Sequence, residues 1–135
     1  MRYLLDVNVL VAWGWADHAD HERVARWVDK VRRKTSDYLL TSAIPQLGFV
    51  RVSVQRAGGK ISPETAGDVL SGMVRSAGAS HLFIPDDQEA IQWPSWCTGA
   101  AKTTDAHLLS LAKKHGAELA SLDRGIPGAF VIEVR

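Results

Sequence analysis

Residues 1–13 read MRYLLDVNVLVAW, an apolar run that a single carboxylate, Asp6, interrupts. Before Asp6, the apolar residues 3–5 predict a short buried strand. After it, the apolar residues resume in a pattern that predicts a helix beginning near Asn8, whose side chain suits the cap of a helix N-terminus. The stretch therefore predicts a strand that ends on an acid and leads directly into a helix.

Strands and helices alternate along the rest of the chain. Further strands are predicted at residues 38–41, 81–84, 118–121 and 130–134. Helices are predicted at residues 20–34, 44–56, 63–77 and about 103–115, with an additional short helix at 88–95. Ser62 is the expected cap of the third of these, Thr103 or Thr104 caps the helix that ends at Gly116, and no linker or repeat is present. The pattern predicts one α/β domain, residues 1–135, with a mostly parallel sheet of about five strands.

Composition excludes several classes of protein. The 135 residues are 46% apolar and 23% charged with a net charge of +1, which is ordinary for a globular domain and gives no general preference for nucleic acid or membranes. One cysteine rules out an internal disulfide framework and is typical of a reducing compartment. Without a signal peptide or membrane-length apolar run, we expect a cytoplasmic protein.

Three aspartates are predicted to reach one edge of the sheet. Asp6 follows the first strand, Asp123 follows the strand at 118–121, and Asp105 lies in the first turn of the helix beginning near residue 103. Ligands of parallel α/β sheets bind outside the carboxyl ends of the strands, and clustered carboxylates suit Mg²⁺ or Mn²⁺. Taken singly, each acid also has a structural interpretation. Asp6 can form a turn and cap with Asn8, Asp105 can interact with the helix dipole, and Asp123 begins the turn sequence DRG.

Four motifs, LLDVNVLVA at 4–12, TSAIPQLGFVRV at 41–52, TTDAHLLSLAKKHG at 103–116 and LASLDRG at 119–125, resemble the PIN-domain family. The likeness is to the VapC-type toxin ribonucleases of bacterial toxin–antitoxin pairs, and it covers essentially the whole chain. It implies a PIN-like α/β/α sandwich and a metal-dependent endoribonuclease acting on structured RNA such as tRNA or rRNA. It also implies a VapB-like antitoxin as partner, and a homodimer that forms a heterotetramer or larger assembly with that antitoxin.

The resemblance assigns the site residues. PIN domains usually have four acids around the metal, and Asp6, Asp105 and Asp123 match three of them. The fourth is usually a glutamate early in the third helix, where this chain has Gln46, and no acid occurs anywhere in residues 41–56. Glutamine keeps one acceptor oxygen but lacks the charge and cannot act as a base. We therefore expect one of three outcomes. The site works with a reduced set of acids, its activity is weakened, or the residue at position 46 has been altered deliberately.

The chemistry of such a site predicts a mechanism. The metal lowers the pKa of a water molecule and polarises a phosphoryl oxygen, so that hydroxide attacks the phosphodiester in line. Asp6 and Asp105 are the expected ligands, Asp123 binds directly or through water, and Asn8 orients Asp6 or a water. Thr104 is a candidate donor to a carboxylate or phosphate. Arg51 and Arg124 are each expected either to bind RNA phosphates or to form structural salt bridges.

Two other functions fit parts of the pattern. Gln46 allows an inactive PIN domain that binds RNA or antitoxin without cutting it. The stretch LLDVNVL also resembles the D-x-D-x-[TV] start of haloacid dehalogenase-like phosphatases, whose second aspartate acts as an acid. Asn8 stands at that second position and cannot transfer a proton, which disfavours a phosphatase.

Overall fold

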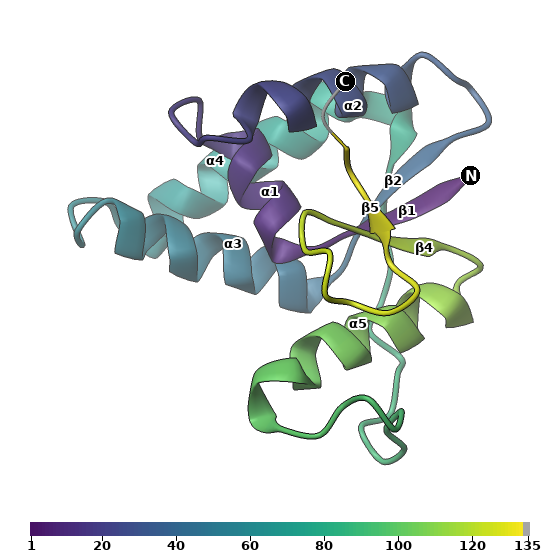
Figure 1. Cartoon of the computed structure of the whole chain (residues 1–135). Coiled ribbons are helices and arrows are strands. Elements are labelled where there is room, and N and C mark those ends of the chain that lie inside the picture. The colour runs from purple at the N-terminus through teal and green to yellow at the C-terminus, as the bar shows by residue number, and fades with distance from the viewer. Residues whose placement is uncertain (134–135) are drawn as a thin grey trace.

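A parallel sheet of five strands forms the centre of the computed structural model, which describes residues 1–133 (Figure 1). The strand order is β3-β2-β1-β4-β5, and each neighbouring pair is parallel. The strands are β1 (Arg2–Leu5), β2 (Tyr38–Thr41), β3 (His81–Phe83), β4 (Glu118–Ser121) and β5 (Phe130–Val131). The predicted sheet of about five mostly parallel strands is confirmed.

Helices cover both faces of this sheet. They are α1 (Val7–Gly14), α2 (His21–Arg32), α3 (Ala43–Arg56), α4 (Pro63–Ala77) and α5 (Thr103–Lys114), with short 3-10 helices at Gly78–Ser80 and Ala100–Lys102. Figure 1 shows α5 on the opposite side of the sheet from α1 to α4, the layering expected of an α/β/α sandwich. None of the helices within residues 1–133 has the length and apolar character that crossing a membrane requires.

The layers follow from side-chain alternation in the buried strands. Leu5 and Leu39 pack in the core beneath α1, α2 and α4, whereas Leu4, Leu40 and Leu119 pack against the leucines of α5. Successive strand residues face opposite sides of a sheet, so strands buried on both faces are apolar throughout. The apolar pairs Leu39–Leu40 and Leu119–Ala120 follow this rule, and the strands at 38–41 and 118–121 were predicted with the bounds that the structure has.

Two predicted helix caps are wrong, while a third is confirmed. The N-cap of α1 is Asp6, not Asn8, because the helix begins at the first residue after the acid. The N-cap of α5 is Lys102 rather than either threonine, since a 3-10 helix runs directly into α5 and Thr103 donates instead to the carbonyl of Ala100 at 2.8 Å. Ser62 caps α4 as predicted, accepting a hydrogen bond from the Thr65 N–H at 3.1 Å.

The segment between β3 and α5 differs most from prediction. No helix forms at residues 88–95, where the chain follows an irregular path with an Asx-type turn in which Asp86 accepts from the Gln88 N–H at 3.2 Å. Strand β3 ends at Phe83, one residue before the predicted end. Strand β5 ends at Val131 rather than 134, and Val134 lies outside the described residues.

Glycine allows α1 and α3 to pack at very short range. A Cβ added at Gly48 of α3 would lie 2.6 Å from Cγ2 of Val7, and one added at Gly14 of α1 would lie 2.7 Å from the ring of Phe49. Neither position has room for a methyl group unless the helices move apart. Because Val7 directly follows Asp6, the contact at Gly48 also fixes α3 beside the acid that ends β1.

We expect Gly48→Ala to lower the free energy of unfolding by about 1–3 kcal/mol, the usual cost of forcing extra volume into a packed core. Gly72 provides the matched control, because it lies inside α4 with no atom within 4 Å of its added Cβ. Gly72→Ala should leave stability unchanged or raise it by about 0.5–1 kcal/mol, since alanine is the better helix former. Chemical denaturation of both variants measures the difference, and equal stabilities would contradict the close packing.

Candidate active site

Asp6 lies at the topological switch point of the sheet. From β1 the chain proceeds to β2 and β3 on one side, while β4 and β5 lie on the other, and such a crevice is where open parallel sheets bind ligands. The side chain is 5% exposed. One carboxylate oxygen accepts from the Val7 N–H at 2.8 Å and the other from the Ser121 hydroxyl at 2.8 Å. The fold thus holds a buried carboxylate in a fixed orientation at the end of its central strand.

Ser121, which sequence reasoning missed, connects this carboxylate to the end of β4. Its hydroxyl donates to Asp6 and accepts from the Asp123 N–H at 3.0 Å and from the Asn8 amide at 3.2 Å. The amide oxygen of Asn8 in turn accepts from the Leu122 N–H at 3.1 Å. Asn8 therefore acts on Asp6 through Ser121 rather than by direct contact. The sequence indicates the role of Ser121 only through its position, two residues before the candidate acid Asp123.

Asp105 faces the same pocket from the opposite layer. It lies in the first turn of α5, and its carboxylate has neither a hydrogen bond nor an ion pair with any of residues 1–133. Burial, followed by the charges of Asp6 and Asp123, raises the pKa of Asp105. Burial is also the main cause that raises the pKa of Asp6, with a smaller contribution from Asp123, while hydrogen bonds from Ser121 and Val7 oppose it.

Asp123 is close enough to act electrostatically on both other acids, but it does not line their pocket. It is exposed, and one of its oxygens accepts from the Gly125 N–H at 2.7 Å in the turn after β4. Among residues 1–133, no three His, Cys, Asp or Glu side chains form a ready-made metal cluster. The structure therefore brings Asp6 and Asp105 to one pocket and leaves Asp123 beside it.

The donor set fits a hard divalent cation. The charge of Asp123 raises the pKa of both Asp6 and Asp105, the charge of Asp6 raises that of Asp105, and neither Asp6 nor Asp105 has a cationic partner within residues 1–133. Buried carboxylates of this kind are costly unless a positive charge compensates them. All available ligands are oxygens, the atoms that Mg²⁺ and Mn²⁺ prefer.

The pocket extends from these acids along α1 and α3, with a volume of about 460 Å³. Its lining consists of Asp6, Val7, Asn8, Val11, His18, Arg51, Val52, Arg56, Thr104 and Asp105. His18 and Arg56 were not predicted as site residues, because the contact of α3 with the loop after α1 is tertiary. Thr104 lines the pocket, and its side chain makes no hydrogen bond within the described part of the chain.

Gln46 lies outside this lining. Its amide donates to the Thr41 hydroxyl at 3.0 Å, and that hydroxyl lies 2.7 Å from Nε2 of His81. Burial lowers the pKa of His81, so the ring is neutral and its Nε2 can accept. With Nε2 of His81 as the acceptor, a chain of donors runs from Gln46 through Thr41 to His81.

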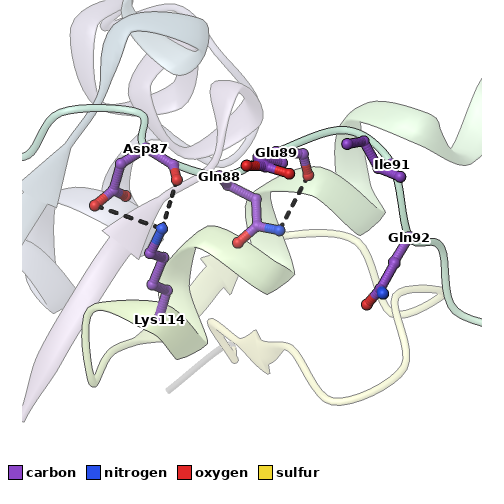
Figure 2. A pocket seen from close by; sticks show the side chains of 6 residues that line it. All are labelled: Asp87, Gln88, Glu89, Ile91, Gln92 and Lys114. Carbon is purple, nitrogen blue, oxygen red and sulfur yellow. Dashed lines mark hydrogen bonds and ion pairs between the residues drawn. The ribbon is translucent and has the colours of Figure 1, made fainter.

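Three other charged residues, Arg124, Asp86 and Asp87, are paired away from the pocket. Arg124 forms an ion pair with Glu133 at 2.6 Å, the structural alternative foreseen for it. After β3, Asp86 lies 2.7 Å from His107 of α5, and Asp87 lies 2.8 Å from His115. Figure 2 shows Lys114 reaching from α5 to Asp87 across a second, polar pocket of about 390 Å³ that none of the three candidate acids lines.

The sequence profile of the PIN domain matches residues 3–129. The chain is 32% identical over 130 residues to ribonuclease VapC39 of Mycobacterium tuberculosis, covering 93% of this chain and 91% of that protein. It is 35% identical over 131 residues to ribonuclease VapC38 of the same species, covering 91% and 86%. Its fold resembles the crystal structure of VapBC2 from Rickettsia felis bound to a promoter DNA fragment, with a TM-score of 0.61, 14% identity and 97% coverage of both chains. The chain therefore belongs to the PIN-domain family, and within it to the VapC type.

Proposed function

We propose that this protein is a metal-dependent endoribonuclease, the toxin of a VapBC-type toxin–antitoxin pair. The observation that carries the proposal is the buried Asp6 facing the unpartnered Asp105 across one pocket at the switch point of the sheet. The relatives named ribonuclease VapC support the same reaction class. Structured RNA such as tRNA or rRNA is the proposed substrate, and a VapB-like antitoxin is the proposed partner of a homodimeric toxin.

Each residue of the site has a proposed role. Asp6 and Asp105 would hold Mg²⁺ or Mn²⁺, with Asp123 completing the set directly or through water. A bound divalent ion supplies positive charge to the phosphodiester and makes water a stronger acid. Ser121 holds the Asp6 carboxylate in position, and Asn8 fixes the end of β4 that carries both Ser121 and Asp123. Thr104, which lines the pocket, would donate to a phosphate oxygen.

The test is incubation with total RNA, with and without Mn²⁺, followed by mapping of the new ends. Attack by water predicts 5′-phosphate ends that form only when the metal is present and that vanish in Asp6→Asn. Ends that form equally in EDTA would contradict the proposal, and so would full cleavage by the variant.

Gln46 supports a second candidate, a PIN domain that binds RNA or antitoxin without cutting. The residue lacks the charge of the usual glutamate, and its amide is committed to Thr41 outside the pocket. Strong Mn²⁺-dependent cleavage by the unchanged protein would eliminate this candidate.

We expect Gln46→Glu to raise Mn²⁺-dependent cleavage by about tenfold, because a new negative charge near the site strengthens cation binding. The glutamate cannot donate to Thr41, so the donor chain reverses and the pKa of His81 should rise at the same time. Gln92→Glu adds the same charge at an exposed residue of the second pocket, which none of the three candidate acids lines, and should change neither quantity. Cleavage rates and NMR titration of His81 measure both effects, and equal cleavage by the two variants would show that position 46 does not serve the site.

A further inference from the structure

The pocket between α1 and α3 has acidic and basic residues at opposite ends. At its start, Gly48 of α3 lies against Val7, next to Asp6. At its far end, Trp15 donates to Ser53 at 3.0 Å and Arg56 reaches Asp17 at 3.1 Å. The two helices therefore run side by side from the acids toward the loop after α1. We refer to His18, Arg51 and Arg56, the basic residues of this lining, as the basic end; Arg51 lies between Gly48 and Arg56 along α3.

The three residues of the basic end differ in how far they are already satisfied. Arg56 is held by Asp17 and lies over the Trp15 ring with 4.9 Å between guanidinium carbon and ring centroid. Nδ1 of His18 accepts from the Asp20 N–H at 3.0 Å, which leaves the proton of a neutral ring on Nε2 as a donor. Arg51 is exposed and has no hydrogen bond or ion pair with any of residues 1–133.

An unpaired arginine in a pocket that also holds unpaired carboxylates indicates an anionic ligand of defined shape. The guanidinium presents a planar fork of donors that matches a phosphate group. The apolar part of the pocket wall is formed by Val7, Val11 and Val52. A ribose or base can lie on this wall, whereas the phosphates on either side of it meet Arg51 and the acidic end.

We propose that Arg51, assisted by the His18 N–H donor, forms a phosphate subsite that binds the RNA backbone phosphate adjoining the one to be cleaved. Arg56 shapes the subsite, and its charge is already compensated by Asp17. The proposal rests on the ribonuclease function proposed above, because it takes an RNA strand as the occupant. The strand lies along α1 and α3, with the scissile phosphate at the acids.

The experiment measures binding of a short fluorescent single-stranded RNA by anisotropy in EDTA, at several KCl concentrations. Arg51→Ala should weaken binding by about tenfold and reduce the salt slope of log Kd by about 0.7, the effect of one lost phosphate contact. Arg51→Lys should keep most of the slope. Arg75 of α4 is the matched control, because it is also exposed and without an ion pair in the described chain. Arg75→Ala should bind as the unchanged protein does.

Equal binding by Arg51→Ala and Arg75→Ala overturns the subsite. Displacement of the RNA by polyglutamate as effectively as by unlabelled RNA also overturns it, because the site would then bind acidic protein segments. A parallel cleavage assay with Mn²⁺ separates this inference from the function on which it rests. If the unchanged protein cleaves but Arg51→Ala keeps the same KM, the subsite fails and the nuclease stands. If Arg51→Ala loses affinity while no variant cleaves, the subsite stands and the nuclease fails.

Discussion

Replacing Asp6 by asparagine is expected to lower RNA cleavage at least about a thousandfold, the effect of losing roughly 4 kcal/mol of transition-state stabilisation from a displaced metal. The substitution preserves the shape of the side chain and an oxygen that can accept from the Val7 N–H at the start of α1. The fold should therefore persist while the central ligand is lost. Metal-dependent cleavage of total RNA measures the change, and a variant that cleaves at the unchanged rate would contradict the role of Asp6.

The same variant should gain folding stability, although it loses cleavage activity. The pKa of Asp6 and of Asp105 is raised by folding, so the folded protein binds more protons than the unfolded chain between about pH 4 and the raised values. The free energy of unfolding contributed by these groups therefore falls as pH rises through that window. Without metal, Asp6→Asn should be more stable than the unchanged protein at neutral pH and should depend less on pH there.

Two other acids do not obscure that measurement. A hydrogen bond from the N-terminal amine lowers the pKa of Asp37, and one from His115 lowers the pKa of Asp87. A lowered pKa gives stability that is present above the ordinary carboxyl value and is lost as pH falls through the lower one. Their effects therefore lie at more acidic pH than those of Asp6 and Asp105. Thermal unfolding in EDTA from neutral pH to about pH 4 also includes His81, whose lowered pKa makes stability fall as pH falls, so the difference between the unchanged protein and Asp6→Asn isolates the site.

Ser121→Ala is expected to reduce Mn²⁺ affinity and cleavage by about 10–100-fold, the usual effect of removing a group that orients a metal ligand. The buried carboxylate of Asp6 would lose its only side-chain donor within residues 1–133, so its pKa should rise further and its ionised form should be less available. Isothermal titration with Mn²⁺ and cleavage kinetics measure the two effects together.

Ser53→Ala is the control for lost stability. Ser53 is a buried serine of α3 whose hydroxyl accepts from the Trp15 indole at 3.0 Å, away from the acids. Both variants leave a buried donor unpaired and should lose about 1–3 kcal/mol of folding free energy. Only Ser121→Ala should lose metal affinity. Unchanged Mn²⁺ binding in that variant would show that the serine serves the fold rather than the site.

The fold could be predicted from the sequence where local pattern and burial agree. The strands at 38–41 and 118–121 have apolar central residues because both of their faces are covered there, and their bounds were predicted as observed. The helix caps at the start of α1 and α5 were not, because they depend on how the preceding residues enter each helix. Residues 88–95 form no helix, and the two acids that precede them are held by His107 of α5 and by His115 just after it.

The sequence predicted which strand end and which helix carry the acids of the candidate site. Acids that follow β1 and begin α5 do reach one pocket, because the carboxyl edge of a parallel sheet brings them there. The positions of Asp123 and Gln46 could not be derived that way. Asp123 accepts a hydrogen bond from the Gly125 N–H, and the amide of Gln46 donates to Thr41. The orientation of each side chain depends on these contacts, which strand topology does not determine. Ser121 and the basic end likewise required tertiary contacts between segments far apart in sequence.

Direct binding of Mn²⁺ tests the central claim, that these aspartates together hold one divalent cation. Electron paramagnetic resonance of the metal with the unchanged protein, Asp6→Asn and Asp105→Asn at neutral pH gives the answer without any RNA. The account predicts saturable binding to the unchanged protein that falls at least about a thousandfold in affinity in either variant. Failure of the unchanged protein to bind Mn²⁺, or binding that neither substitution weakens, would contradict it.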